Sequence, residues 1–240
     1  MNTYTTGRID FHCHMLPAID DGSSGMDESC AMAALSAGDG VSVLIMTPHF
    51  YAGSDDPERF FARRDAALAQ FRAALPPDSP TILPGAEVLY FEGLSGMDAL
   101  PRMRIGNSRA LLVEMPFCRW PQHVINDIIQ LNDGIEYQVV LAHIERYLDY
   151  QKKSTLEAFL DAGVLFQSNC EFFTDSGTRR KALRMLKKGM IHLLGTDCHN
   201  LTTRRPNMAD ACRIIGDKFG EEAEQMLMSR AARLLADQTE

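Results

Sequence analysis

Residues 9–14 read Ile9-Asp10-Phe11-His12-Cys13-His14, an apolar run that ends in two histidines. Successive side chains of a β-strand point to opposite faces, so His12 and His14 share one face and Cys13 points to the other. Near the other end of the chain, Leu193-Leu194-Gly195-Thr196-Asp197-Cys198-His199 repeats this arrangement with Asp197 and His199. We therefore expect two buried strands that carry metal-binding side chains at their carboxyl ends.

Four further apolar runs end in the same kinds of residue. The runs 43–49 and 138–143 stop at a histidine, and the runs 82–87 and 111–114 stop at a glutamate. A single case would be an ordinary capped strand end, but six favour one shared site, because imidazole and carboxylate ligands suit divalent transition ions. The candidate ligands are His12, His14, Asp21, His49, Glu87, Glu114, His143, Asp197 and His199, which leaves only His123 and His192 among the histidines.

Short apolar runs alternate with longer amphipathic stretches along the whole chain. Strands are expected at 8–13, 41–47, 81–87, 110–114, 137–142, 164–168 and 190–195. Helices are expected at 26–38, 57–75, 121–133, 154–162, 177–188, 207–217 and 220–236. Strands that are apolar throughout predict a parallel sheet covered by helices.

The position of the candidate ligands favours a closed sheet over an open one. They follow the ends of nearly all seven strands, and a closed ring brings such ends to one mouth. We therefore predict the α/β class, with a distorted seven-stranded (β/α) barrel. A length of 240 residues fits one domain, 1–240, with 92–109 as an excursion beside the barrel.

Composition excludes several classes of protein. The net charge of -8 argues against non-specific nucleic-acid binding, which calls for a basic face. We find no signal peptide and no apolar stretch long enough to span a bilayer. The six cysteines form no C-x-x-C pair, so we expect reduced thiols in a cytoplasmic protein.

The ligand set indicates hydrolytic chemistry. Nine such residues could hold three ions if Glu87 bridges two of them, and Mn, Fe or Zn suits them better than Mg or Ca. Such a cluster lowers the pKa of a bridging water and clamps a phosphoryl group. Arg146 follows His143 by three residues and is expected to bind phosphate in a bidentate manner. The alternative is a surface arginine that pairs with Glu145.

Several motifs carry a resemblance to a known family. They are the stretches 10–22, 47–49, 83–87, 114–117, 143–146 and 196–200, in this order along the chain. The chain resembles the polymerase-and-histidinol-phosphatase (PHP) superfamily and, within it, the bacterial manganese-dependent protein-tyrosine phosphatases of capsule and exopolysaccharide clusters. The resemblance implies a trinuclear site in a distorted seven-stranded barrel, with Mn²⁺ as the expected ion. It also implies a phosphotyrosyl protein as substrate, such as a bacterial tyrosine kinase, and it is compatible with an oligomer.

The same resemblance implies how the ligands divide. His12 and His14, with Glu87 and Asp197, would hold one ion; Glu87 and His143, with Glu114, the second; and Asp21, His49 and His199 the third. Glu114 is typical of the tyrosine-phosphatase branch and could also donate a proton. The chain departs from the branch at Ile144, where proline is usual, and at Cys13 and Cys198, where small residues are usual.

Three other functions compete with this one. Cys198 and Arg204 fit the C-x5-R pattern of cysteine-dependent phosphatases, but no glycine lies between them and Cys198 should point away from the site. A second alternative is a non-catalytic metal-bound scaffold. The third is a small-molecule phosphatase, such as one that acts on histidinol phosphate.

Aromatic residues are expected on the loops around the mouth of the barrel. They are Phe50, Tyr51, Phe117, Trp120, Phe172 and Phe173. If they frame the mouth, they suit a flat phenolic ester better than a polar chain, although loop packing is the commoner role of such residues. We therefore expect a preference for phosphotyrosyl substrates.

Overall fold

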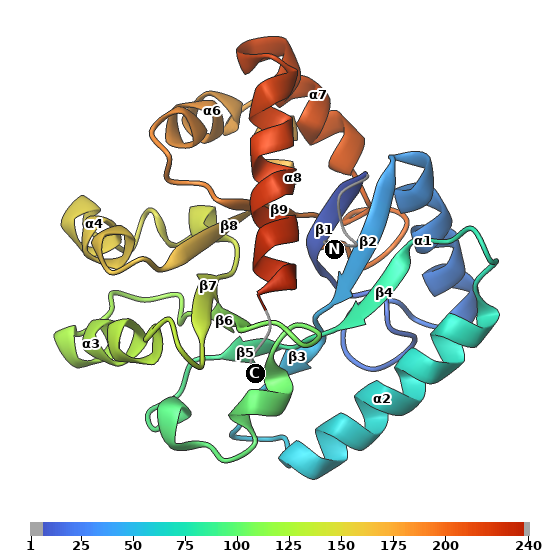
Figure 1. Cartoon of the computed structure of the whole chain (residues 1–240), viewed down its shortest axis with the longest axis horizontal. Helices are drawn as coiled ribbons and strands as arrows, with labels where there is room; N and C mark the ends of the chain where they lie inside the picture. Colours follow the sequence, from blue (N-terminus) through green and yellow to red (C-terminus); the bar gives the residue numbers. More distant parts are fainter. Residues whose placement is uncertain (1–6, 238–240) are drawn as a thin grey trace.

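The structure is a computed structural model that describes residues 7–237. Its strands run parallel to their neighbours, and helices surround them (Figure 1). The strands are β1 (Arg8–Cys13), β2 (Val41–Met46), β3 (His49–Phe50), β4 (Thr81–Pro84), β5 (Glu87–Leu89), β6 (Ala110–Glu114), β7 (Gln138–Leu141), β8 (Leu165–Asn169) and β9 (Leu193–Gly195). The predicted α/β class with parallel strands is confirmed.

Breaks occur at two of the seven predicted strands: 81–87 is split in two, and 41–47 is followed by a further short strand. The run from residue 41 divides into β2 and β3 at Thr47-Pro48, and the run from residue 81 divides into β4 and β5 at Gly85-Ala86. Proline has no N–H to donate, which explains the first break. At the second, a Cβ on Gly85 would lie 3.2 Å from Ile105 Cγ1, so a side chain would crowd its neighbour. The strands consequently form two sheets, ordered β1-β2-β4 and β3-β5-β6-β7-β8-β9.

The first and last strands lie side by side, so the strand layer is curled. His14 N donates to Cys198 O (3.0 Å) and Asp197 N donates to His12 O (2.7 Å). The buried Asp10 carboxylate also accepts hydrogen bonds from the backbone N and the hydroxyl of Thr196. These contacts bring two ligand-bearing strand ends, one from each end of the sequence, into direct contact.

The helices fall close to their predicted positions. They are α1 (Met26–Gly38), α2 (Pro57–Ala74), α3 (Gln122–Leu131), α4 (Lys153–Asp161), α5 (Glu171–Thr174), α6 (Arg179–Lys187), α7 (Met208–Phe219) and α8 (Glu221–Ala236). The start of α2 shows why: Asp56 accepts a hydrogen bond from Arg59 N, and Pro57 occupies the first turn. The short α5 was not predicted. Within 92–109 the chain forms two 3-10 turns, Leu94–Gly96 and Leu100–Met103.

Two apolar clusters fill the molecule. The inner one joins strand residues such as Phe11, Ile45 and Val140 to Ala231 and Leu235 of α8. Helix α8 lies across one end of the curled strands (Figure 1), where Met228 accepts a hydrogen bond from Ile9 N near the start of β1. The other end, at the carboxyl termini of the strands, is left for the polar side chains. No helix within residues 7–237 has the length and apolar character that crossing a membrane requires.

Candidate metal centre

All nine candidate ligands come together at the carboxyl ends of the strands. They arrive from β1 (His12), β3 (His49), β5 (Glu87) and β6 (Glu114) and from the loops that follow β1, β7 and β9. The only one with a largely exposed side chain is Asp21, at 68%. The others are buried or, in the case of His49, nearly so.

Glu87 lies at the centre of this cluster. Its Oε2 is 3.3 Å from His12 Nε2, 3.3 Å from His14 Nε2 and 3.0 Å from His49 Nδ1. Its Oε1 is 2.8 Å from His143 Nε2. Burial alone would raise the pKa of Glu87, but the surrounding imidazoles, His12 first, hold it well below the usual value. One carboxylate therefore touches four of the five candidate histidines, as a bridging ligand would.

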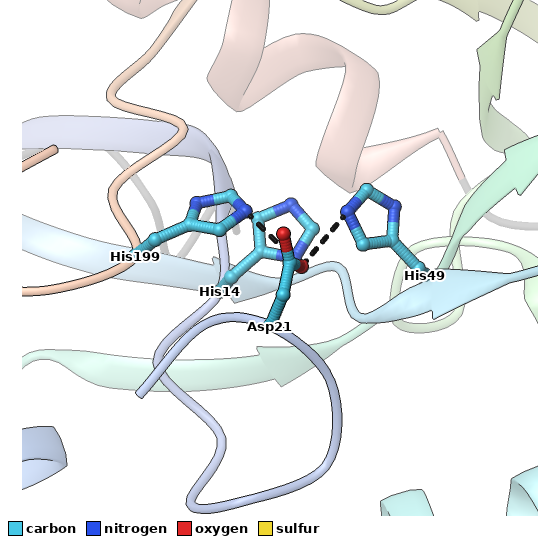
Figure 2. A group of neighbouring side chains, drawn as sticks. All are labelled: His14, Asp21, His49 and His199. Atoms are coloured by element: carbon cyan, nitrogen blue, oxygen red, sulfur yellow. Dashed lines mark ion pairs between the residues drawn. The ribbon is translucent and has the colours of Figure 1, made fainter. Parts of the chain in front are cut away.

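A second group of side chains lies around Asp21 (Figure 2). Asp21 Oδ1 is 3.3 Å from His49 Nε2 and 3.5 Å from His199 Nε2, and the ligand atoms of His14 are within reach of the same point. His49 also belongs to a third group with Glu87 and Glu114. The groups thus share His14, His49 and Glu87, so they form one continuous cluster of possible ligand atoms.

Three of the candidate histidines are held through Nδ1, so that Nε2 faces the centre. Nδ1 of His12 contacts Gln167 Oε1 (3.1 Å), Nδ1 of His14 contacts Asp20 Oδ2 (2.8 Å), and Nδ1 of His199 contacts the backbone O of Asp197 (2.9 Å). When Nδ1 donates to an oxygen, Nε2 keeps its lone pair, which is the usual arrangement of a metal-ligating histidine. Asp20 was not among the predicted residues.

The two oxygens of Asp197 face different partners. Oδ2 accepts hydrogen bonds from Arg146 Nη2 (2.6 Å) and Asn169 Nδ2 (2.8 Å), and it forms an ion pair with Arg204 Nη2 (2.7 Å). Oδ1 faces the imidazoles, 3.5 Å from His12 Nε2 and from His14 Nε2. Arg146 therefore lies against the cluster, whereas Glu145, the partner expected in the alternative interpretation, accepts from Asn169 N.

Arg204 and Asn169 were missed as functional candidates. Arg204 was noted only for its distance from Cys198 in the sequence, and Asn169 lies in a stretch without histidine or acid. A polar cavity of about 190 Å³ lies beside Asp197, and Arg204 and Arg205 line it. A larger cavity of about 700 Å³, lined by Arg8 and Glu224 among others, lies near the start of β1 and is remote from this chemistry.

Two of the candidate ligands have strained backbones. His143 has φ 29° and Asp197 has φ 51°, in the region that residues with a Cβ seldom adopt. Such strain persists only where surrounding contacts impose it, and it collects at functional sites. Here it occurs just where two strands end and their side chains must turn into the cluster.

The donor set fits divalent ions. Glu87 Oε2 and His199 Nε2 are buried without a hydrogen-bond partner, although each lies close to other ligand atoms. A buried polar atom without a partner is costly, and lone pairs that converge on one point are what a cation requires. The chemistry of these residues therefore fits a bound divalent ion. The ligand atoms within each of the three groups described above are also close enough together to hold one.

The cysteine-dependent alternative does not fit the geometry. Cys198 is fully buried, and its backbone forms an isolated parallel bridge with that of Cys13 at the end of β1. The backbone amides of Thr202, Thr203 and Arg204 all donate to the Asn200 side chain, so they form no cradle for a phosphate. A thiolate mechanism needs an exposed sulfur within such a cradle.

The aromatic residues expected at the mouth divide into two sets. Phe50, Trp120, Phe172 and Phe173 are buried, so the expectation that they line the mouth is wrong. Tyr51 and Phe117 are exposed, at 37% and 47%. Tyr51 stacks on the imidazole of His49 (5.2 Å between ring centroids, 20° between planes), and Phe117 stacks on that of His143 (6.0 Å, 24°).

The two histidines outside the candidate set lie elsewhere. His123 pairs with Glu92 at the surface, and His192 accepts a hydrogen bond from Phe166 N. Their exclusion from the cluster agrees with the sequence prediction.

Comparison with known proteins places the chain in a family. The sequence profile described as "Capsular polysaccharide synthesis, CpsB/CapC" matches residues 8–236. Tyrosine-protein phosphatase YwqE of Bacillus subtilis is 30% identical over 240 residues, covering 96% of this chain and 92% of that protein. Tyrosine-protein phosphatase CpsB of Streptococcus pneumoniae is 28% identical over 246 residues, covering 96% and 99%. A crystal structure from a study of YwqE and CpsB superposes on this protein with a TM-score of 0.83 at 26% identity. The match covers 96% of this chain and 95% of that one, and the study describes YwqE and CpsB as unique metal-dependent tyrosine phosphatases. These matches confirm the branch that the motifs indicated, and the protein belongs to the CpsB/CapC family.

Proposed function

We propose that this protein is a metal-dependent phosphomonoesterase that hydrolyses phosphotyrosine in proteins. The observation that carries the proposal is the nine-residue cluster of imidazoles and carboxylates with two exposed aromatic rings stacked on two of its histidines. The names of the family relatives support the same activity.

The nine residues are assigned as ligands, with Glu87 as a bridge. Mn²⁺ is the proposed ion, in two to three equivalents per chain, and Fe or Zn also suits such ligands. Bound divalent ions would supply an activated water and neutralise the charge of a phosphate ester. Oδ1 of Asp197 and Nε2 of His12, His14 and His199 are the atoms aimed at those ions.

Arg146 and Glu114 are assigned to the chemical step. The Arg146 side chain is 35% exposed and lies at 2.6 Å from Asp197, so its guanidinium can bind phosphoryl oxygens while it remains next to the ligand cluster. Arg204 holds the same carboxylate oxygen from another side and can assist. Glu114 lies 3.5 Å from His143 Nε2 and is assigned as a ligand that would also take a proton from the attacking water and pass it to the leaving phenolic oxygen.

The exposed rings favour an aromatic substrate. Tyr51 and Phe117 stack on His49 and His143, and both of these imidazoles touch Glu87. A phenyl phosphate whose phosphorus lies over Glu87 would therefore find an aromatic ring near it. Offset or edge-on ring contacts stabilise such a complex, whereas a histidinol or nucleotide ester would gain less from them.

The proposed activity leads to further proposals about the substrate protein, the cellular compartment and the domain organisation. We propose that the substrate is a phosphotyrosyl protein of capsule or exopolysaccharide synthesis, such as a tyrosine kinase, and that the enzyme acts in the cytoplasm. The six cysteines form no disulfide, which supports a reducing compartment. We further propose that residues 1–240 act as a single domain and that the two sheets together make one distorted seven-stranded barrel, supported by the β1–β9 contact and by the inner core.

The test is a substrate panel with the full-length protein at saturating Mn²⁺. We expect kcat/KM to be higher for phosphotyrosyl peptides than for phosphoseryl peptides, nucleotides or histidinol phosphate. A preference for histidinol phosphate would instead support the small-molecule phosphatase, and turnover of no ester would support the non-catalytic scaffold. Elemental analysis of the same preparation measures the metal content directly.

A further inference from the structure

Strand β8 supplies none of the nine candidate ligands, yet two of its side chains reach the cluster. Gln167 and Asn169 are two residues apart, so they point to the same face of the strand. Both are buried, with exposures of 0% and 4%. Together they connect His12 to Asp197 through an uninterrupted series of hydrogen bonds.

The direction of each hydrogen bond in this series follows from chemistry. A carboxylate only accepts, so Asn169 must turn its Nδ2 towards Asp197 Oδ2 (2.8 Å) and its Oδ1 towards Gln167. Gln167 then donates from Nε2 to Asn169 Oδ1 (3.0 Å), which directs its Oε1 towards His12 Nδ1 (3.1 Å). The same Oε1 accepts from His143 N (2.8 Å), which fixes the amide in this orientation independently.

We propose that Gln167 and Asn169 are positioning residues that hold His12 and Asp197 in the form that binds metal. Because Gln167 Oε1 accepts, His12 carries its proton on Nδ1 and presents the lone pair of Nε2 to the centre. Because Asn169 shares Oδ2 with Arg146 and Arg204, Asp197 keeps Oδ1 for the centre. The inference rests on the proposed metal site and adds to it the residues that determine its geometry.

Close packing leaves the series little freedom. Gly195, opposite Asn169 in the β8–β9 pairing, has no side chain, and a Cβ there would lie 2.6 Å from His12 Cβ and 2.9 Å from Gln167 Nε2. The Gln167 amide is therefore confined between β1 and β9. Partners of this kind orient ligands and fix the histidine tautomer in metal proteins.

The experiment uses the full-length protein with three substitutions and one control. Gln167→Met keeps the length of the side chain but removes the acceptor from His12, and Asn169→Asp keeps its shape but cannot donate to Asp197. Gln167→Glu restores an acceptor for His12 and serves as a rescue. Ser168→Ala is the matched control, since Ser168 is buried on the same strand, points to its other face, and donates its hydroxyl to the backbone O of Asn169 rather than to a candidate ligand.

Two measurements apply to each protein. The first is Mn²⁺ affinity, from the free-ion signal in electron paramagnetic resonance titrations. The second is the His12 tautomer, from long-range ¹H–¹⁵N correlation spectra of histidine-labelled protein, with His12 assigned by its absence in His12→Gln. We expect Gln167→Met and Asn169→Asp to lose about 10- to 100-fold in Mn²⁺ affinity, with Ser168→Ala unchanged.

The spectra separate positioning from a merely structural role. His12 should be protonated on Nδ1 in the wild type, in Ser168→Ala and in Gln167→Glu, but not uniformly so in Gln167→Met. Protonation on Nε2 in the wild type, or wild-type affinity in both Gln167→Met and Asn169→Asp, overturns the inference. If the wild type binds no divalent ion, the proposed function fails, and the tautomer in the same spectra still decides the role of Gln167.

Discussion

Phe117 and Trp120 lie three residues apart on one loop. Replacing Phe117 with alanine should lower substrate selectivity, whereas replacing Trp120 with alanine should lower stability. Phe117 is 47% exposed and stacks on His143 and Tyr147, whereas Trp120 is 4% exposed and packs against Tyr147 and Phe159. An aromatic pair contributes about 0.5–1.5 kcal/mol beyond its buried area, so Phe117→Ala should lower phosphotyrosyl over phosphoseryl selectivity by roughly 2- to 12-fold. Trp120→Ala removes a buried indole that also donates to Pro116 O, at a cost of about 3–5 kcal/mol in stability.

The assay compares kcat/KM for two peptides that differ only in phosphotyrosine or phosphoserine, together with urea unfolding of each variant. Phe117→Leu is the matched control, because it keeps apolar area but removes the aromatic ring. We expect Phe117→Ala to unfold at nearly the wild-type midpoint and Trp120→Ala to unfold much earlier. Unchanged selectivity in both Phe117 variants would refute the role of the exposed ring. Wild-type stability in Trp120→Ala would contradict the packing described for the loop.

Three further perturbations test other parts of the molecule. Arg146→Ala should leave metal content intact and lower kcat/KM by roughly 30- to 1000-fold, because a bidentate charge-assisted contact contributes about 2–4 kcal/mol to transition-state binding. If the Arg146→Lys variant has the kcat/KM of the wild type, the bidentate role of Arg146 is wrong. A strong chelator should abolish hydrolysis of para-nitrophenyl phosphate, and added Mn²⁺ should restore it. Cys198→Ala should keep most of the wild-type activity. Loss of activity in Cys198→Ala at wild-type stability would support the thiolate mechanism instead. Burial, with a contribution from Arg230, lowers the pKa of His192 to about 4. The unfolded chain, with a histidine pKa of about 6.5, binds that proton more tightly, so the free energy of unfolding should fall by up to about 3 kcal/mol as pH drops from about 6.5 to about 4. His192→Asn keeps an acceptor for Phe166 N and should remove this part of the pH dependence in denaturant titrations, and an unchanged pH profile in that variant would contradict the assignment.

The sequence was sufficient to locate the cluster because parallel strands end at a common edge. Eight of the nine candidate ligands lie at the ends of six apolar runs, and no knowledge of strand pairing is needed to expect that such ends converge. Gln167, Asn169 and Arg204 could not be found in this way. Their roles depend on which neighbour each faces, and the β8–β9 register that brings Asn169 towards Asp197 leaves no periodic signal in either strand.

The fold was predicted less well where local chemistry interrupts a regular element. Pro48 and Gly85 end strands that their apolar neighbours would have continued, and they divide the strands between two sheets. The burial of the aromatic side chains also could not be predicted from the sequence pattern. Phe50 and Tyr51 are adjacent, yet Phe50, which ends β3, is buried, and Tyr51, which begins the following loop, is exposed.

The contact between β1 and β9 also governs when the centre can form during synthesis. The hydrogen bonds from Thr196 to Asp10 join groups 186 residues apart, and closing so long a loop is entropically costly and kinetically late. His12 and His14 leave the ribosome well before Asp197 and His199, because the chain emerges from its amino terminus. A nascent chain can therefore offer only part of the ligand set. If the proposed metal site is correct, tight metal binding begins only when β9 docks against β1, so metal occupancy would report that the strands from β1 to β9 have assembled.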